Sequence, residues 1–338
     1  MRKIIMFSSL ILLLLCGCEN EESDSNINAD ANEMGDIKLE DIFGEEEEID
    51  VSFDENGDFI GISGIDLVFD YENLEGVSLK CENNMVNNKL NFSTKAKKLD
   101  VGVIIFVDGI LQPVSFNGGA SKEFNIITVG GEKTETDISY ELISGKGGSS
   151  VRVNTMTLLN PSLEITENTT SVGVCFRESQ NIALSAMCSR DVECEPGDST
   201  FEKIPMPQDI KNIVEMEKKQ QDAVIHIKAV YKQNGEETDR LSINGDRLVF
   251  DMELYGGEYG EYNLYVFLNN TSINCFNGKK YNQVKVSSDD ITKVAVDADV
   301  SQLNLPEYTQ LFVVAAPVGS IAGGELEKFN NIIVDNID

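Results

Sequence analysis

The residues of this chain that could perform acid–base chemistry are one histidine and a large excess of carboxylates. His226 lies in the apolar stretch Val224–Tyr231, and the sequence offers no Gly-x-Ser-x-Gly elbow to complete a nucleophilic constellation around it. We interpret His226 as a structural residue of a strand. Glycosidases need only two carboxylates, and the 58 acidic residues supply many candidate pairs without distinguishing any of them. The sequence therefore predicts no catalytic residue and no cofactor.

The segment Asp54–Asp58 begins like an acidic calcium-binding loop. Its sequence, Asp-Glu-Asn-Gly-Asp, resembles the first ligand positions of such a loop. The pattern then fails, because position six is Phe59 instead of glycine and position twelve is Ile65 instead of glutamate. The Asn-Gly pair at its centre favours a tight hairpin turn. We therefore predict a turn here and no metal site.

Five cysteines follow the N-terminal segment, and an odd number leaves at least one thiol without an intramolecular partner. Cys188 and Cys194 could close a small disulfide loop in an oxidising compartment, whereas their spacing is poor for zinc. The other three lie in apolar or alternating runs and are interpreted as small core residues; they are Cys81, Cys175 and Cys275.

Short apolar segments separated by turn signals indicate an all-β fold. Runs rich in Val, Ile, Phe and Tyr alternate with Asn-Gly, Asp-Gly and Gly-Gly pairs, which favour the positive backbone angles of hairpins. This spacing is typical of β-sandwiches. The absence of tryptophan excludes an antibody-type domain and leaves an immunoglobulin-like or jelly-roll-like sandwich. The turn pairs are Asn56-Gly57, Asp108-Gly109, Asn117-Gly118, Gly130-Gly131, Asn234-Gly235 and Asn277-Gly278.

Blocks of sequence recur in the same order, which predicts two tandem, homologous β-sandwich domains. The spacing between matched blocks shrinks along the chain, as expected if the first copy has the longer loops. The copies cover about 51–190 and 228–338. The matched blocks are Ile62–Asp70 with Ile243–Asp251, Val103–Gly109 with Leu264–Asn270, Phe116–Gly118 with Phe276–Gly278, and Lys122–Val129 with Lys279–Val286.

A bridge at 191–227 joins the two copies and contains the one convincing helix signal, near 207–221. Pro207 suits a first helical turn, and Ile210, Ile213 and Val214 follow at helical spacing. Lys218 and Lys219 place cations near the C-terminal end. The helix is predicted either as a spacer or as a clamp that fixes the angle between the two domains.

The charge distribution restricts the class of partner. A formal net charge of −31 would repel a phosphate backbone, so nucleic acid is excluded as a partner. The same charge favours the solubility of a surface protein. Residues 18–50 are dominated by Glu, Asp, Asn and Ser, and they cannot bury enough apolar surface to offset their ordering entropy. They are predicted to be a disordered acidic tether.

The first eighteen residues have the order of a secretory signal. Arg2 and Lys3 precede the apolar run Ile4–Leu15, which is too short for a spanning helix of about 20 residues. The segment Leu15-Cys16-Gly17-Cys18 resembles the lipobox of bacterial lipoproteins. The resemblance implies that residues 1–17 are a signal peptide and that Cys18, linked to a diacylglyceryl group, becomes the mature N-terminus.

Together these patterns favour an extracytoplasmic protein anchored to the bacterial cell membrane through its lipid. The predicted role is non-catalytic binding or scaffolding at the cell envelope, with an envelope polymer or a protein as ligand. Sandwich domains commonly bind through loops, and the expected contact loops are Glu82–Lys98 and Asp137–Asn154. The alternative is an envelope hydrolase that acts on glycan or another polymer through paired carboxylates.

Overall fold

The structure is a computed structural model. It describes residues 50–53, 59–63, 67–72, 74–94, 98–130, 133–159, 161–162, 165–167, 169, 179–220, 226–256, 260–319 and 325–336. All of these residues belong to one compact unit of the chain, Asn32–Asp338. The predicted signal peptide, most of the acidic tether and the segment Asp54–Asp58 lie outside the described residues.

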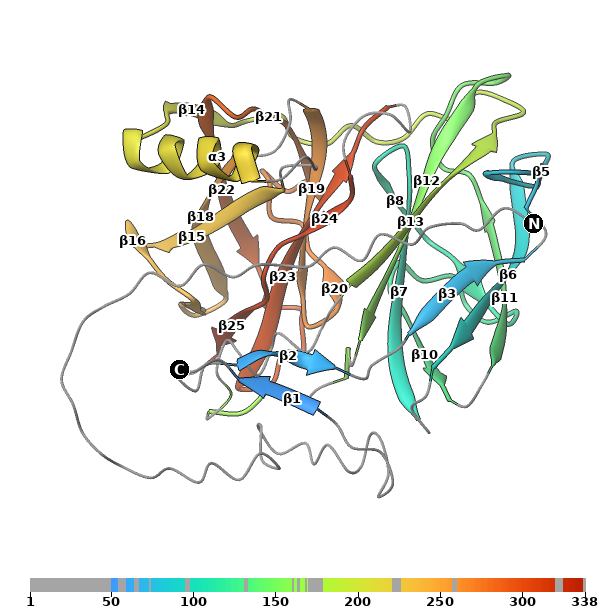
Figure 1. Cartoon of the computed structure of the whole chain (residues 1–338), viewed down its shortest axis with the longest axis horizontal. Helices are drawn as coiled ribbons and strands as arrows, with labels where there is room; N and C mark the ends of the chain where they lie inside the picture. Colours follow the sequence, from blue (N-terminus) through green and yellow to red (C-terminus); the bar gives the residue numbers. More distant parts are fainter. Residues whose placement is uncertain are drawn as a thin grey trace. The chain divides into compact units, whose positions relative to one another are not determined.

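The first sandwich consists of two packed sheets (Figure 1). We name the sheet that contacts the second sandwich the first inner sheet and the other the first outer sheet. The outer sheet runs β3 (Val68–Tyr71), β6 (Met85–Ser93), β11 (Thr134–Glu141), β9 (Ser115–Phe116), with β5 (Cys81–Glu82) on β6. The inner sheet runs β10 (Asn125–Val129), β7 (Leu99–Val107), β12 (Ser150–Leu159), β13 (Ser179–Met187), β4 (Ser78–Leu79), with β8 (Ile110–Gln112) on β7.

The second sandwich is built in the same way. Its outer sheet runs β14 (Glu202–Pro205), β22 (Asp290–Asp299), β18 (Arg247–Gly256), β15 (Ile227–Gln233), β16 (Glu236–Glu237). Its inner sheet runs β17 (Arg240–Ser242), β25 (Ile332–Asp335), β23 (Tyr308–Pro317), β19 (Gly260–Leu268), with β20 (Thr271–Ser272) and β21 (Tyr281–Val286) on β19 and β24 (Glu327–Lys328) on β23. A separate hairpin pairs β1 (Asp50–Phe53) with β2 (Phe59–Ser63). The prediction of tandem β-sandwiches is confirmed.

The two inner sheets have equivalent strand orders, β10-β7-β12-β13-β4 and β21-β19-β23-β25-β17. Each ends in a parallel pair, β13 with β4 and β25 with β17, while the other pairs are antiparallel. The block Val103–Gly109 and its match Leu264–Asn270 fall on equivalent strands, β7 and β19. The matched block nearest the N-terminus does not fall on equivalent strands. Its part Val68–Asp70 lies in β3, whereas the corresponding Val249–Asp251 lies in β18.

Four of the six predicted turn pairs lie wholly within the described residues and form turns, while Asn56-Gly57 and Gly131 lie outside the described residues. Asp108-Gly109, Asn117-Gly118, Asn234-Gly235 and Asn277-Gly278 all have φ between 49° and 84° at both positions. Asn, Asp and Gly tolerate this left-handed region better than other residues, so these pairs set the turn locally.

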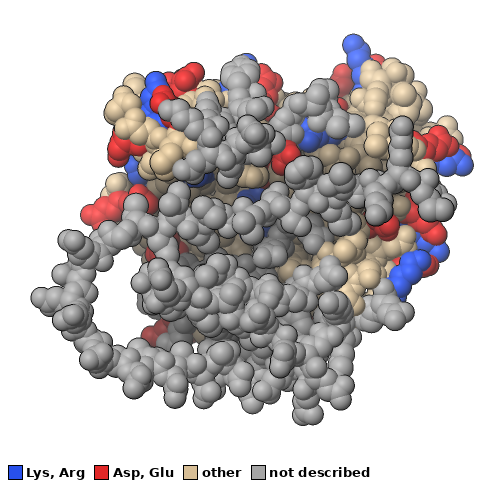
Figure 2. All heavy atoms as spheres, viewed as in Figure 1, with Lys and Arg blue, Asp and Glu red and all other residues tan. Residues whose placement is uncertain are grey.

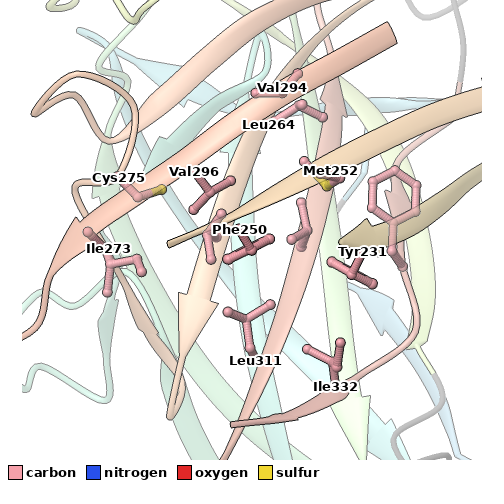
Figure 3. Close-up of a cluster of buried hydrophobic side chains, with 14 of the residues drawn as sticks. Tyr231, Phe250, Met252, Leu264, Ile273, Cys275, Val294, Val296, Leu311 and Ile332 are labelled. Carbon is pink, nitrogen blue, oxygen red and sulfur yellow. The ribbon is translucent and has the colours of Figure 1, made fainter. Parts of the chain in front are cut away.

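Each sandwich has its own apolar core between its two sheets. In the first, Phe69, Leu90 and Ile138 of the outer sheet pack with Val103 and Val153 of the inner sheet. Figure 3 shows the corresponding core of the second, in which Phe250 and Met252 of β18 lie with Leu264, Val296 and Leu311. Strands with alternating burial, such as β18, expose their other face to solvent.

A third core joins the two sandwiches through their inner sheets. Ile104 and Phe106 of β7 and Met156 of β12 pack with Tyr265 of β19 and Phe312 of β23. Both faces of the inner sheets are therefore buried, which explains why β7, β12, β19 and β23 are buried along nearly their whole length. The four sheets are stacked, with the outer sheets at the two ends.

The bridge contains the predicted helix, α3, at Gln208–Gln220. Pro207 immediately precedes it, and its carbonyl accepts a hydrogen bond of 2.9 Å from Lys211 N. Before the helix, β14 pairs with β22, so this part of the bridge belongs to the second outer sheet. Further upstream, the backbone of Asp198 makes hydrogen bonds with Tyr281 and Gln283 of β21. The bridge is thus bound to the second sandwich before α3 begins.

Candidate functional site

The outward face of the first outer sheet carries a hollow with a volume of about 380 Å³. The residues that line it come from β6, β9 and β11, from the turn after β9, and from the position that follows β3. Most of their side chains are amides, hydroxyls or charged groups. They are Glu72, Asn87, Asn88, Lys89, Ser115, Gly118, Asp137, Ile138 and Ser139.

Neighbouring strands hold the polar side chains of the hollow in place. Ser139 Oγ donates to Asn87 Oδ1 at 2.8 Å, across the pairing of β11 with β6. Asn117, in the turn after β9, accepts the amide of Asp137 at 3.0 Å through Oδ1. The Asp137 carboxylate makes no hydrogen bond within the described part of the chain, and its side chain is exposed. The hollow therefore presents hydrogen-bonding groups to solvent on a rigid sheet.

The outward face of the second outer sheet carries three charge pairs across its described strands, whereas that of the first has one such pair, between Lys89 and Glu135. Lys232 of β15 lies 2.8 Å from Glu253 of β18, and Lys293 of β22 lies 2.9 Å from Asp251 of β18. Arg247 and Asp297 form a further pair between β18 and β22. Figure 2 shows acidic and basic side chains side by side on the described surface. Fewer groups of this face remain available to a ligand.

The carboxyl of Asp108 has a pKa above its usual value. Burial raises the pKa, while the backbone and the guanidinium of Arg152 oppose the rise. Asp108 Oδ1 accepts Arg152 N at 3.1 Å, so the carboxylate caps the hairpin between β7 and β8. No second carboxylate contributes to the shift, as one would in a closely paired acid and base. Asp108 also lies outside the hollow.

His226 is placed differently from the prediction. It precedes β15 instead of lying inside a strand, and its side chain is 47% exposed. Its Nδ1 lies 2.9 Å from Glu327 Oε1 of β24. The structure therefore gives this histidine a surface contact between β24 and the start of β15.

Cys188 and Cys194 do not form the disulfide that their spacing in the sequence would allow. Cys188 is a buried thiol in the first core and Cys194 an exposed one. Cys194 interacts with Tyr281 of the second sandwich, whereas Cys188 contacts Asn84 of the first. Cys275 is buried in the second core, as predicted, and burial raises its pKa well above the usual range. Cys18 and Cys175 lie outside the described residues.

The segments expected to be contact loops are mostly strands. Glu82–Lys98 contains β6, and Asp137–Asn154 contains the end of β11 and the start of β12. Both contribute to the hollow, but through a sheet face. Sequence reasoning missed this face because its alternating polar residues look like the ordinary solvent side of a strand. Within the described ranges, no group of three His, Cys, Asp or Glu could hold a metal ion, and no helix is long and apolar enough to cross a membrane.

No protein-family model matches the chain, and no curated protein matches it. Three solved structures illustrate the likenesses found. The CsuC–CsuE chaperone–tip adhesion subunit complex of Acinetobacter baumannii is 12% identical, with 80% of this chain and 100% of that chain covered and a TM-score of 0.20. The C-terminal domain of the AgI/II polypeptide BspA of Streptococcus agalactiae is 7% identical, with 80% and 100% covered and a TM-score of 0.20. The major pilin subunit BcpA of Bacillus cereus is 12% identical, with 86% and 75% covered and a TM-score of 0.21. TM-scores this low carry no argument about what this chain does.

Proposed function

We propose that this protein is a bacterial lipoprotein, anchored outside the cytoplasm through Cys18, that binds a polymer of the cell envelope without chemical conversion. The observation that carries the binding role is the hollow on the first outer sheet. Its Asn, Ser and Asp side chains offer both donors and acceptors, and the sheet beneath fixes their spacing. A chain rich in hydroxyl and amide groups, such as an envelope glycan, has the matching chemistry.

The stacked sheets support a scaffolding role for the protein, because they hold two outward faces apart. Since the inner sheets are buried against each other, the two outward faces are held at opposite ends of the stack. One face carries the hollow and the other is covered by paired charges. The shared strand order of the two inner sheets supports the proposal that the sandwiches arose by duplication. In this proposal only the first copy keeps a binding face.

Membrane anchoring is tested by fractionation. The Cys18→Ala chain should leave the membrane fraction in detergent-free buffer, because stable attachment needs more than one acyl chain and each buried CH₂ contributes about 0.8 kcal/mol. Cys16→Ala is the matched control and should remain with the membranes. Retention of the Cys18→Ala chain in the membrane fraction contradicts the lipoprotein proposal.

Binding is tested with purified peptidoglycan sacculi as the probe. The wild-type chain should co-sediment with the sacculi, and Asn87→Ala combined with Asp137→Ala should reduce the bound fraction at least about 10-fold, the effect of losing about 1.4 kcal/mol of binding free energy. The matched control removes one exposed charge from the opposite face, Asp297→Asn. A double variant that binds like the wild type rules out the hollow as the site.

The same assay separates binding from hydrolysis. Soluble reducing ends are measured after incubation of the sacculi with the chain. If wild type releases them and Asp137→Asn or Glu72→Gln lowers the rate by about 100-fold or more, the size expected for loss of acid–base catalysis, the protein is an enzyme and the binding proposal is wrong.

A further inference from the structure

Two cysteines that are far apart in the sequence lie near each other in the first sandwich. The parallel pairing of β4 with β13 sets Ser78 against Ser185 and Leu79 against Ala186. Just beyond this pairing, Cys81 begins β5, which pairs with β6 of the outer sheet, and Cys188 directly follows β13. The pairing thus brings the two segments that carry the cysteines together.

Both thiols belong to the first core. Leu79 and Ala186, where the two segments pair, are buried in that core. Cys188 is itself a member of it, and the partly buried Cys81 packs against it. The two side chains thus share one apolar core.

Asn84, in the turn between β5 and β6, contacts both sulfur atoms. Its Oδ1 lies 3.5 Å from Cys188 Sγ, and its backbone interacts with the Cys81 thiol. Asn84 is fully buried, and the same Oδ1 accepts both Ser189 N and Ser189 Oγ at 2.7 Å. The two sulfurs are therefore gathered around one fixed residue. The proximity of Cys188 further raises the pKa of Cys81, which burial has already raised.

We propose that Cys81 and Cys188 are a redox pair that closes to a disulfide in an oxidising compartment. A disulfide needs Cα atoms about 4.4–6.8 Å apart, and thiols that both contact Asn84 lie in the same part of the first core. The bond would join the β4–β5 segment to the end of β13. Its formation in the cell rests on the extracytoplasmic location proposed above.

The chemistry requires a disulfide as oxidant, which is a disulfide-donating protein in the cell and oxidised glutathione in the test below. The Cys81 thiol is the more exposed, so it loses its proton and attacks the donor's disulfide, which releases one donor thiolate. Cys188 then loses its proton and attacks the Cys81 sulfur, which releases the second donor thiolate. The two cysteines lose two electrons, and the donor disulfide is reduced to two thiols.

The exposed Cys194 is not the partner of Cys188 in this structure. Cys194 interacts with Tyr281, whose hydroxyl donates to Glu195 O at 2.9 Å. Cys188 is enclosed on another side by Gly145, where an added Cβ would lie 3.1 Å from its sulfur. The two residues that were close in sequence thus contact different sandwiches.

The test is carried out first on the purified full-length chain. The reduced protein is equilibrated with reduced and oxidised glutathione, alkylated, digested and mapped by mass spectrometry without reduction. A linked peptide pair that contains Cys81 and Cys188 is expected, and Cys194→Ser should leave its yield unchanged. Cys81→Ser should abolish the linked pair and expose Cys188 to alkylation after unfolding. Failure to form this pair, or a Cys188–Cys194 link in its place, overturns the proposal.

Urea unfolding provides a second measurement on the same samples. The oxidised wild-type chain should unfold at a higher urea concentration than the reduced chain, whereas oxidised and reduced Cys81→Ser should have the same midpoint. The mapping is then repeated on chain trapped with alkylating reagent in intact cells. A pair that forms in glutathione but is reduced in cells keeps the redox assignment and contradicts the extracytoplasmic location. Absence of the pair in both settings contradicts the redox assignment alone.

Discussion

Tyr265 of the second sandwich donates its hydroxyl to the carbonyl of Gly109 in the first at 3.2 Å and accepts the amide of Leu111 at 3.1 Å. Asn263 Nδ2 donates to the same Gly109 carbonyl at 3.0 Å. Gly109 has a positive φ of 76°, and an added Cβ would lie 3.0 Å from Pro317 O. The Asp-Gly turn between β7 and β8 therefore fits against the second sandwich at a point where only glycine is accommodated.

Polar contacts of this kind flank the apolar core between the inner sheets. Glu123 of the first sandwich accepts Ser272 Oγ at 2.6 Å and Lys280 Nζ at 2.7 Å. Asn270 Nδ2 donates to Pro161 O at 2.6 Å. Directional bonds fix the orientation of two surfaces that apolar packing alone would leave free to slide. This interface therefore holds the two sandwiches together, and no short sequence pattern predicted it.

We expect Tyr265→Phe to destabilise the full chain by about 1–3 kcal/mol, because the buried amide of Leu111 loses its partner. The matched control is Tyr231→Phe, which removes a weak 3.4 Å bond to Asn330 O inside the second sandwich. Urea unfolding followed by circular dichroism gives both values. If both variants lose the same free energy of unfolding, the hydroxyl of Tyr265 does not stabilise the interface between the sandwiches.

We expect the separated sandwiches to associate. A fragment of residues 50–190 and another of residues 198–338 should each show a strand-dominated circular dichroism spectrum, since each retains its own core. Each would also expose the apolar face that contains Phe106 or Phe312, so the mixed fragments should form a one-to-one complex in sedimentation velocity. Phe106→Ala should weaken that complex. Two folded fragments that do not associate in sedimentation velocity would contradict a tight interface.

We expect Gly197→Ala to loosen the bridge. An added Cβ at Gly197 would lie 2.3 Å from the ring of Tyr281, which is held between Gly197 and Tyr265. Overpacking of this kind costs about 1–3 kcal/mol. Limited trypsin digestion should then cut faster after Arg190 or Lys203. Gly245→Ala is the control: its Cβ would meet open space and its φ of 58° strains alanine, so it lowers stability in a distant turn and should not speed cleavage at these sites.

We expect Asp108 to make stability depend on pH. Because burial raises the pKa of the folded carboxyl, the stability that comes from its protonation is fully present below the unfolded pKa, near 4, and is lost as the pH rises through the folded value. Asp108→Asn keeps an acceptor for Arg152 N and removes this dependence. The urea midpoint of wild type relative to Asp108→Asn should therefore fall as the pH rises above about 4.

The control for this experiment is Asp246→Asn, which removes one exposed charge from a chain of net charge −31. Its midpoint should follow that of wild type across the pH range, apart from a uniform offset. If Asp108→Asn and Asp246→Asn behave alike, the buried environment of Asp108 does not control the pH response.

The sequence alone determined the features that depend on neighbouring residues. Asn117-Gly118 and Asn277-Gly278 form turns because these residue types enter the left-handed region at low cost, and α3 begins after Pro207 because proline suits a first turn. Alternating segments such as β18 and β22 predicted half-buried strands correctly.

Only the tertiary structure decided which segments meet. The continuous apolar run Val101–Val107 was compatible with any buried strand, and its second buried face became apparent only when the inner sheets were seen to pack together. The hollow gathers side chains from three strands, and Cys81 and Cys188, from distant segments, both contact Asn84. Long-range strand register depends on the complementarity of whole faces and on loop closure, neither of which is encoded in a short stretch of sequence.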